Sequence, residues 1–259
     1  MSERTCLVEI PWETRNLGVQ SFAVCEEFLE NPEEDVLRRA LQEKDNQLRG
    51  IFVQARLGKK HLPSARCLER SGFYFVESTL VPSCLLVKNQ RLSDFACDSR
   101  PFVPQRFLLE ELRLSLLDKV DPTGCRRVRE IAAESFSDDR FHRDPQCGKE
   151  VADRRFVFWV DDLLADDAVV FNVLLYREEA IGFMARRGEN LVLAGFSAKH
   201  VKSGLGDYLW LAVLEDMLQR GFVRVRTLIS SSNTAVLNLY ARMGFKFEES
   251  AATFHYWSR

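Results

Sequence analysis

The sequence predicts an α/β protein in which helices cover a central sheet, and in which a smaller first half is related to a larger second half. Two observations predict this class: helices alternate with strands, and a 43-residue segment is repeated. At a fixed offset of 172 residues, 36–78 aligns with 208–250 without a gap, and 11 positions are identical. The largely polar stretch Gln90–Gln105 contains two prolines and is interpreted as a linker between domains at 1–95 and 106–259.

Each copy of the repeat has the pattern of a helix, a strand, a second helix, a Gly-Phe pair and a further strand. In the second copy, apolar residues of 209–217 lie on one helical face, and Gly221 follows a basic last turn as a C-cap requires. The remaining patterns predict a helix at 128–136, a buried strand at 168–176, hairpin strands at 180–185 and 191–197, a strand at 222–229, a helix at 234–242 and a strand from Phe245.

The composition limits the classes of function. Charged side chains nearly balance, with a formal net charge of -2, so nothing indicates a nucleic-acid partner. No apolar run approaches the roughly 20 residues that span a bilayer, and the first residues lack the pattern of a signal peptide, so we expect a cytoplasmic protein without a membrane partner. The seven cysteines are scattered without metal-ligand spacing, which favours free thiols and no metal.

A glycine turn precedes the helix that opens the second copy. In Gly204-Leu205-Gly206 the backbone N–H groups are free to bind an anion, and the positive end of the helix dipole strengthens such binding. The first copy has Pro32-Glu33-Glu34 in the same places, where two carboxylates would repel a diphosphate. We therefore expect a phosphate-bearing cofactor in the second half and a degenerate, cofactor-free first half, although such turns often only connect elements.

An asparagine and a tyrosine follow on the next helix. Asn233 lies where it can cap the helix or bind an amide, and Tyr240 lies two turns further along. A tyrosine hydroxyl can donate a proton to a leaving thiolate in acyl transfer. Taken singly, Asn233 is explained equally well as a helix cap, and Tyr240 as a core residue. The first copy has His61 and Leu68 instead, so the pair is lost where the glycine turn is lost.

These elements, in this order, resemble the GNAT superfamily of N-acetyltransferases. The resemblance implies a mixed, twisted sheet with flanking helices, preceded here by a degenerate GNAT-like half-domain. It also implies acetyl-CoA as co-substrate, with Tyr240 as general acid. The family pattern has Arg or Gln where this chain has Val201, and Lys202 beside it can replace part of the charge. The implied cofactor-binding residues are Phe196, Ser197, Ala198, Val201, Lys202, Ser203, Gly204, Leu205, Gly206, Asp207 and Asn233.

Within the superfamily the chain is similar to two-part members that acetylate nucleotide-linked amino sugars. The segments that carry this likeness are Pro11–Gly18, Leu68–Glu77, Ala133–Asp144 and Asn233–Trp257. The likeness implies that Glu77 relays the amine proton through water; an exposed carboxylate is the plain alternative. Arg140 and His142 are the expected substrate-binding residues. The strand at 191–197 carries no carboxylate that can serve as a base.

The function expected from the sequence is therefore acetyl-CoA-dependent N-acetylation of a primary amine on a small molecule. The expected acceptor is a nucleotide-linked amino sugar. An amino acid, an antibiotic or a peptide N-terminus is an alternative acceptor. A non-catalytic acyl-CoA-binding protein is an alternative class. A homodimer is compatible with the sequence but is not indicated by any pattern in it.

Overall fold

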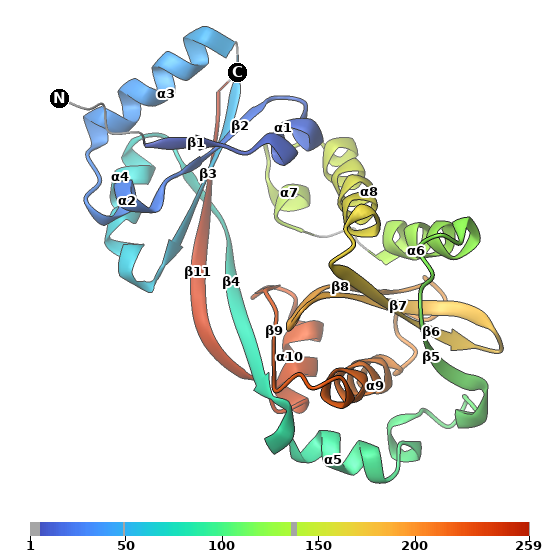
Figure 1. Cartoon of the computed structure of the whole chain (residues 1–259). Helices are drawn as coiled ribbons and strands as arrows, with labels where there is room; N and C mark the ends of the chain where they lie inside the picture. The colour runs from blue at the N-terminus through green and yellow to red at the C-terminus, as the bar shows by residue number, and fades with distance from the viewer. Residues whose placement is uncertain (1–5, 49, 136–138, 259) are drawn as a thin grey trace.

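One mixed sheet runs through the whole protein. The structure is a computed structural model that describes residues 6–48, 50–135 and 139–258. Its eleven strands have the order β1-β2-β3-β11-β4-β9-β8-β7-β6-β5, with β10 beside β4 (Figure 1). The pairs β2/β3 and β8/β9 are parallel and the others are antiparallel. The predicted α/β class, with a mixed sheet and flanking helices, is confirmed.

The first half forms a small sheet with helices on both faces. Its elements are β1 (Leu7–Glu9), α1 (Pro11–Leu17), β2 (Gln20–Val24), α2 (Glu26–Glu30), α3 (Glu34–Leu48), β3 (Ile51–Gly58), η1 (Lys59–Ser64), α4 (Ala65–Arg70) and β4 (Tyr74–Leu85). Acidic residues in the first turn favour the start of α3, and Leu37 and Leu41 are buried on its inner face. Leu68 of α4 packs in the same core.

The second half encloses its sheet between two helical layers. Helix α9 and helix α5 pack on one face, while α6 and α8 pack on the other. The elements are η2 (Leu86–Lys88), α5 (Gln90–Cys97), η3 (Arg100–Phe102), η4 (Leu109–Glu111), β5 (Leu112–Leu116), α6 (Pro122–Ser135), α7 (Arg140–Arg143), α8 (Lys149–Ala165), β6 (Val169–Tyr176), β7 (Glu179–Arg187), β8 (Asn190–Phe196), α9 (Gly206–Gln219), β9 (Arg224–Arg226), β10 (Ile229–Ser230), α10 (Thr234–Arg242) and β11 (Lys246–Trp257). Residue 136, where the predicted helix 128–136 was to end, lies outside the described residues.

The repeat is visible in the structure. Strands β4 and β11 have twelve residues each and begin and end at positions that differ by 172, the offset found in the sequence. Yet β11, from the second copy, lies between β3 and β4 of the first copy, and β4 in turn pairs with β9 of the second. The last strand of each copy is thus built into the sheet of the other, and the long pair β4/β11 joins the halves (Figure 1).

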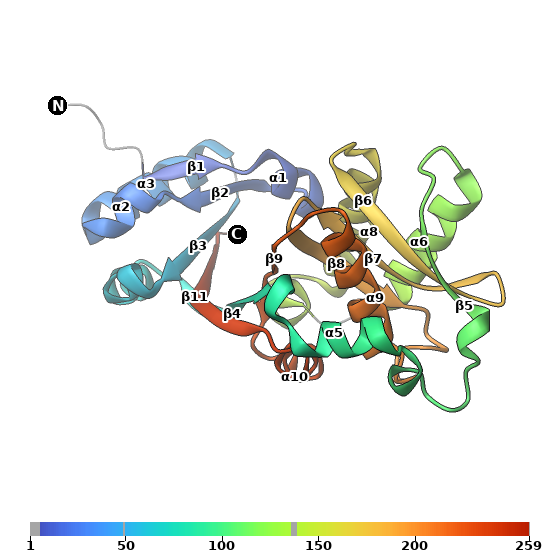
Figure 2. The ribbon, with the colours of Figure 1, turned by 60° about the horizontal axis from the view of Figure 1, so that its bottom comes forward.

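The stretch Gln90–Gln105, interpreted as a linker, contains in its first part a helix that the sequence pattern did not indicate. Residues 90–97 form α5, which lies below α9 in Figure 2. The side chain of Asn89 caps this helix by accepting from the N–H of Leu92, and Leu92 and Phe95 are buried against α9. Two apolar residues at a spacing of three, in an otherwise polar stretch, are too few to predict a helix.

A buried carboxylate fixes the joined strands to the segment after α7. Asp144 is 2% exposed and accepts hydrogen bonds from Tyr74 of β4 and from His255 and Trp257 of β11. Burial by itself raises the pKa of Asp144, but the bonds from His255, Tyr74 and Trp257 together outweigh it and hold the pKa below its ordinary value. Desolvation also lowers the pKa of His255, so this ring is neutral at neutral pH and donates from Nδ1.

None of the helices among the described residues combines the length and the apolar character that are needed to cross a bilayer.

Replacing Asp144 with Asn should lower the free energy of unfolding by about 2–3 kcal/mol at pH 7, because an amide cannot accept all of these bonds. The folded pKa of Asp144 is depressed, so its stabilisation is present above the unfolded pKa of about 4 and is lost as the pH falls through the folded pKa. Urea unfolding at a series of pH values should therefore show the difference shrinking below about pH 4.

The matched control is Asp98→Asn, because the half-exposed Asp98 side chain bonds to the guanidinium and the backbone N–H of its near neighbour Arg100 at the surface. We expect this change to cost less than about 1 kcal/mol. Equal losses in the two variants would contradict the role given to Asp144.

Candidate active site

The sheet opens where β8 and β9 separate. These parallel strands share one residue pair, Asn190 with Arg226, and among the described residues they are not paired beyond it. Thr227 closes the base of the opening, because its hydroxyl donates to the carbonyl of Leu191 at 2.8 Å while its N–H donates to Pro82 at 3.1 Å. An opening of this kind between parallel strands exposes backbone groups that an extended ligand can reach.

Tyr240 lies at the base of this opening. Helix α10 buries its side chain to 3% exposure, with the ring against Trp210 and Phe245 at centroid distances of 6.1 and 4.7 Å. Burial raises the pKa of Tyr240 to about 12, although the side chains of Trp210 and Thr227, which face the hydroxyl, lower it in part. The phenol therefore keeps its proton at neutral pH and is a proton donor, not a base.

Asn233 occupies the N-cap of α10. Its side-chain oxygen accepts from the N–H of Val236 at 3.2 Å, and the side chain is exposed. The capping role is therefore real, and it uses only the oxygen, so the amide NH₂ stays available to a ligand at the mouth of the opening.

The glycine loop turns from β8 into α9 as predicted. Gly204 has a φ of +86°, a conformation that side chains with a Cβ rarely adopt. Within the described part of the chain, the N–H groups of Gly204 and Gly206 meet no acceptor. These groups lie at the N-terminus of a 14-residue helix, which is the arrangement that binds a phosphate or a diphosphate.

Arginines that the sequence did not indicate lie against this loop. The guanidinium of Arg106 donates to the carbonyl of Ser203 at 2.5 Å, and Arg91 and Arg242 pair with Asp207 in the first turn of α9 at 2.6 and 3.0 Å. Val201, at the position where the family pattern has a basic or amide side chain, is half exposed. Arg91 lies on α5, within the stretch interpreted as a linker, and recognition of this helix could have placed it; Arg106 directly follows that stretch.

Glu77 lies on β4 opposite Thr253 of β11, in the part of the sheet that faces α7. The next residue, Ser78, accepts from the N–H of Ser231, two residues before Asn233. The joined strands thus bring Glu77 of the first copy to the start of α10 in the second. Its role as a proton relay remains a prediction.

Arg140 and His142 belong to α7, and internal partners hold both. The ring of His142 contacts Asp139 at 2.7 Å and Asp153 at 2.8 Å, and its side chain is 6% exposed. Arg140 pairs with Glu13 at 3.1 Å. Their predicted contact with substrate remains untested, but in this structure their polar groups already have protein partners.

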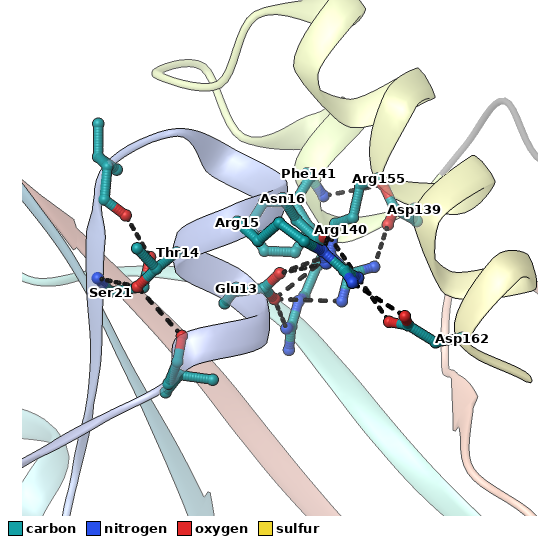
Figure 3. A network of polar contacts seen from close by, with 12 residues as sticks. Glu13, Thr14, Arg15, Asn16, Ser21, Asp139, Arg140, Phe141, Arg155 and Asp162 are labelled. Atoms are coloured by element: carbon teal, nitrogen blue, oxygen red, sulfur yellow. Dashed lines mark hydrogen bonds and ion pairs between the residues drawn. The ribbon is translucent and has the colours of Figure 1, made fainter. Parts of the chain in front are cut away.

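Figure 3 shows why Arg140 is held in place. Glu13, on α1, is fully buried and accepts from Arg155 of α8 at 3.0 Å as well as from Arg140. Arg15 of α1 also donates to Asp162 of α8. The network ties the first half to the two helices α7 and α8, which cover the sheet beside the opening, and so fixes the wall of the site.

Comparison with known proteins shows which proteins the chain is similar to. Residues 125–245 match the model of the Acetyltransferase (GNAT) family. The fold resembles that of a GCN5-related N-acetyltransferase from Sphaerobacter thermophilus, with a TM-score of 0.61, 14% identity, 96% of this chain and 75% of that chain covered. It also resembles a tandem GNAT protein from the clavulanic acid biosynthesis pathway, with a TM-score of 0.61, 13% identity, and 92% and 75% of the two chains covered.

The split between β8 and β9, the glycine loop and Tyr240 all lie within the matched segment 125–245. The match covers slightly less than half of the chain, and it supports the resemblance to the GNAT superfamily that the sequence indicates. The chain is also 25% identical over 144 residues to the spore coat polysaccharide biosynthesis protein SpsD of Bacillus subtilis (strain 168). That match covers 53% of this chain and about half, 49%, of SpsD.

Replacing Gly204 with Ala should destabilise the protein by about 1–2 kcal/mol, because a Cβ is strained at this φ and would lie 3.0 Å from Cγ of Pro104. Urea unfolding measures the loss. Gly58→Ala is the control, since Gly58 has a negative φ and a Cβ there meets no atom within 4 Å. A loss at Gly58 as large as that at Gly204 would show that the loop geometry is not responsible.

Proposed function

We propose that the protein transfers an acetyl group from acetyl-CoA to a primary amine, with the second half as the catalytic one. The observation that carries this proposal is Tyr240, a buried phenol kept protonated at the base of the β8/β9 opening. The opening is bordered by the loop whose free N–H groups suit a diphosphate. A proton donor and an anion site on the same split sheet are the two parts that thioester chemistry requires.

The chain's own residues supply distinct contributions. The N–H groups of Gly204 and Gly206 bind the diphosphate of the cofactor, and the NH₂ of Asn233 contacts its arm. The bound thioester supplies the activated acetyl group. Tyr240 then gives its proton to the departing thiolate, which avoids release of a charged sulfur into a buried site. Glu77 of β4, which lies near the start of α10, accepts the proton of the attacking amine through water.

Arg106 compensates for the missing cation at Val201. Its guanidinium lies at the carbonyls of Ser203 and Lys202, at 2.5 and 3.4 Å, and among the described residues it has no carboxylate partner. A positive charge beside the loop favours an anionic cofactor in the way that the usual Arg or Gln side chain does. Phe196, Ser197, Ala198, Leu205 and Asp207 complete the loop in this proposal.

The first half is the cofactor-free copy in this proposal. Leu68, the counterpart of Tyr240, is fully buried among apolar side chains of α2, α3 and β3. Pro32-Glu33-Glu34, the counterpart of the glycine turn, presents acids at the positive end of α3. The first half therefore contributes walls and strands to the site, and the second half contributes the chemistry.

The acceptor that we favour is a nucleotide-linked amino sugar. The sequence resembles dTDP-fucosamine (TDP-4-amino-4,6-dideoxygalactose) acetyltransferase, and the curated relative SpsD is named for polysaccharide biosynthesis. An amino acid, an antibiotic or a peptide N-terminus remains the alternative acceptor. A protein that binds acyl-CoA without catalysis remains the alternative from another class.

Tyr240→Phe should lower kcat for thiol release from acetyl-CoA by about 100-fold or more, with little change in acetyl-CoA affinity, because only the proton donor is removed. The measurement uses a panel of dTDP- and UDP-linked amino sugars, amino acids and peptides, with calorimetry for acetyl-CoA binding. Tyr176→Phe, a tyrosine on β6 remote from α10, is the matched control. Acetyl-CoA binding without turnover of any amine by the unaltered protein would favour the non-catalytic alternative.

Arg106→Ala should weaken acetyl-CoA binding by about fivefold, because a partly exposed charge near a diphosphate contributes about 1 kcal/mol. Calorimetric titration measures the change, and higher salt should reduce it. Arg100→Ala is the control, since Arg100 lies on the same stretch but pairs with Asp98. Equal affinities for Arg106→Ala and the unaltered protein would remove Arg106 from the cofactor site.

A further inference from the structure

A cleft of about 630 Å³ lies between the two halves. Its walls come from β3, β8 and the start of β11, and from Trp159 of α8. Small residues, among them Gly58 and Ala251, line part of it, and a Cβ on Gly58 would meet no atom within 4 Å. This volume is in the range of small-molecule sites, about 300–1,000 Å³.

The cleft reaches the proposed reaction centre. Leu191 and Thr227 line it, and these are the two residues that close the base of the β8/β9 opening beside Tyr240. A ligand in the cleft can therefore place one end at the acetyl group while the rest lies across β4 and β11 toward the first half.

Three cations line this cleft, of which Lys60 pairs with Glu30 and Arg226 pairs with Glu249; the third is Arg56. It projects from β3, its side chain is exposed, and its guanidinium donates to the hydroxyl of Thr79 on β4 at 3.2 Å. Among the described residues it has no carboxylate partner.

Thr79 lies opposite Ser230 of β10 and three residues before Pro82, whose carbonyl accepts from the N–H of Thr227. With about 3.3 Å per residue along a strand and about 4.8 Å between strands, Thr79 and Thr227 are about 11 Å apart.

Two buried polar atoms in the lining have no partner. His61 is 4% exposed and its Nε2 makes no hydrogen bond in the described structure, and the same holds for Nε of Arg226, whose Nη2 pairs with Glu249 at 3.1 Å. Such atoms lose free energy unless a ligand or water satisfies them. Both residues line the cleft, as does the carboxylate of Glu26 on the rim.

We propose that this cleft binds the nucleoside diphosphate portion of the acceptor, with Arg56 as the residue that anchors its phosphates. The inference rests on the proposed function and names the group of this chain that selects the substrate. A span of about 11 Å between Thr79, which Arg56 contacts, and Thr227 leaves room for one sugar ring between a phosphate and an amine. A free amino acid is too short to reach both. Trp159 offers an aromatic surface for the base.

The position differs from the one that the sequence suggests for a phosphate-bearing substrate. Arg140 and His142 have their polar groups in ion pairs with Glu13, Asp139 and Asp153. Arg56 has none, so binding a phosphate there breaks no existing ion pair. The site also needs both copies of the repeat, because β3, β4 and β11 meet only through the joined strands.

The test is calorimetric titration of the full chain with UDP and with dTDP, without acetyl-CoA. We expect binding that weakens by about tenfold or more in Arg56→Ala and is largely retained in Arg56→Lys. Arg66→Ala, an exposed arginine on α4 outside the cleft, should bind as the unaltered protein does. Acetyl-CoA affinity, titrated separately, should be unchanged in all three variants.

The outcomes separate this inference from the proposed function. If neither nucleotide binds while simple amines are acetylated, the cleft is not a nucleotide site and the transferase function stands. Equal nucleotide affinity in Arg56→Ala and the unaltered protein would overturn the role of Arg56. If acetyl-CoA fails to bind although UDP or dTDP binds in an Arg56-dependent manner, the proposed function fails and the nucleotide site stands.

Discussion

The insertion of β11 between β3 and β4 is the constraint on which the rest of the structure depends. Seven residues of β11 pair with β3 and nine pair with β4, so the backbone hydrogen bonds of one copy of the repeat are completed by the other. Neither half can keep its sheet intact if the halves separate, because unpaired buried strand edges are costly. The relative placement of the halves is thereby fixed, and with it the cleft between them.

Buried polar groups secure the same arrangement on the helical side. Asp144 receives hydrogen bonds from both joined strands, and Glu13 receives them from Arg140 and Arg155. Breaking such a group away from its partners leaves a charge without compensation in a dry environment. The helices α7 and α8 are therefore held over the sheet beside Tyr240, and the wall of the site is set by charges that do not contact a ligand.

The two copies of the repeat show how one scaffold serves two purposes. In the second, a glycine turn and Tyr240 provide an anion site and a proton donor. In the first, acids replace the glycines and Leu68 fills a core. The first copy retains the strands because the second copy needs them: β4 pairs with β9 and brings Glu77 to the start of α10. The first copy can therefore lack the catalytic residues and still be needed for the strands that it supplies.

Local patterns in the sequence determined the elements and the loop chemistry. The elements within each copy of the repeat, the glycine turn and the cap at Asn233 could be predicted because each depends on residues close together in the chain. Helix α5 was missed because only Leu92 and Phe95 mark its buried face. Arg91 and Arg106 were missed with it, since nothing near them in sequence indicates a neighbour about 100 residues away.

What only the tertiary structure decided is which strands are neighbours. The sequence suggests two domains in succession, because a repeat carries no record of whether its last strand joins its own sheet or that of its partner. A strand paired within its own copy and a strand paired with the other copy show the same alternation of side chains and make nearly the same hydrogen bonds. Long-range packing therefore decides which of the two pairings forms. Arg56 of β3 reaches Thr79 of β4 across β11 only through that choice.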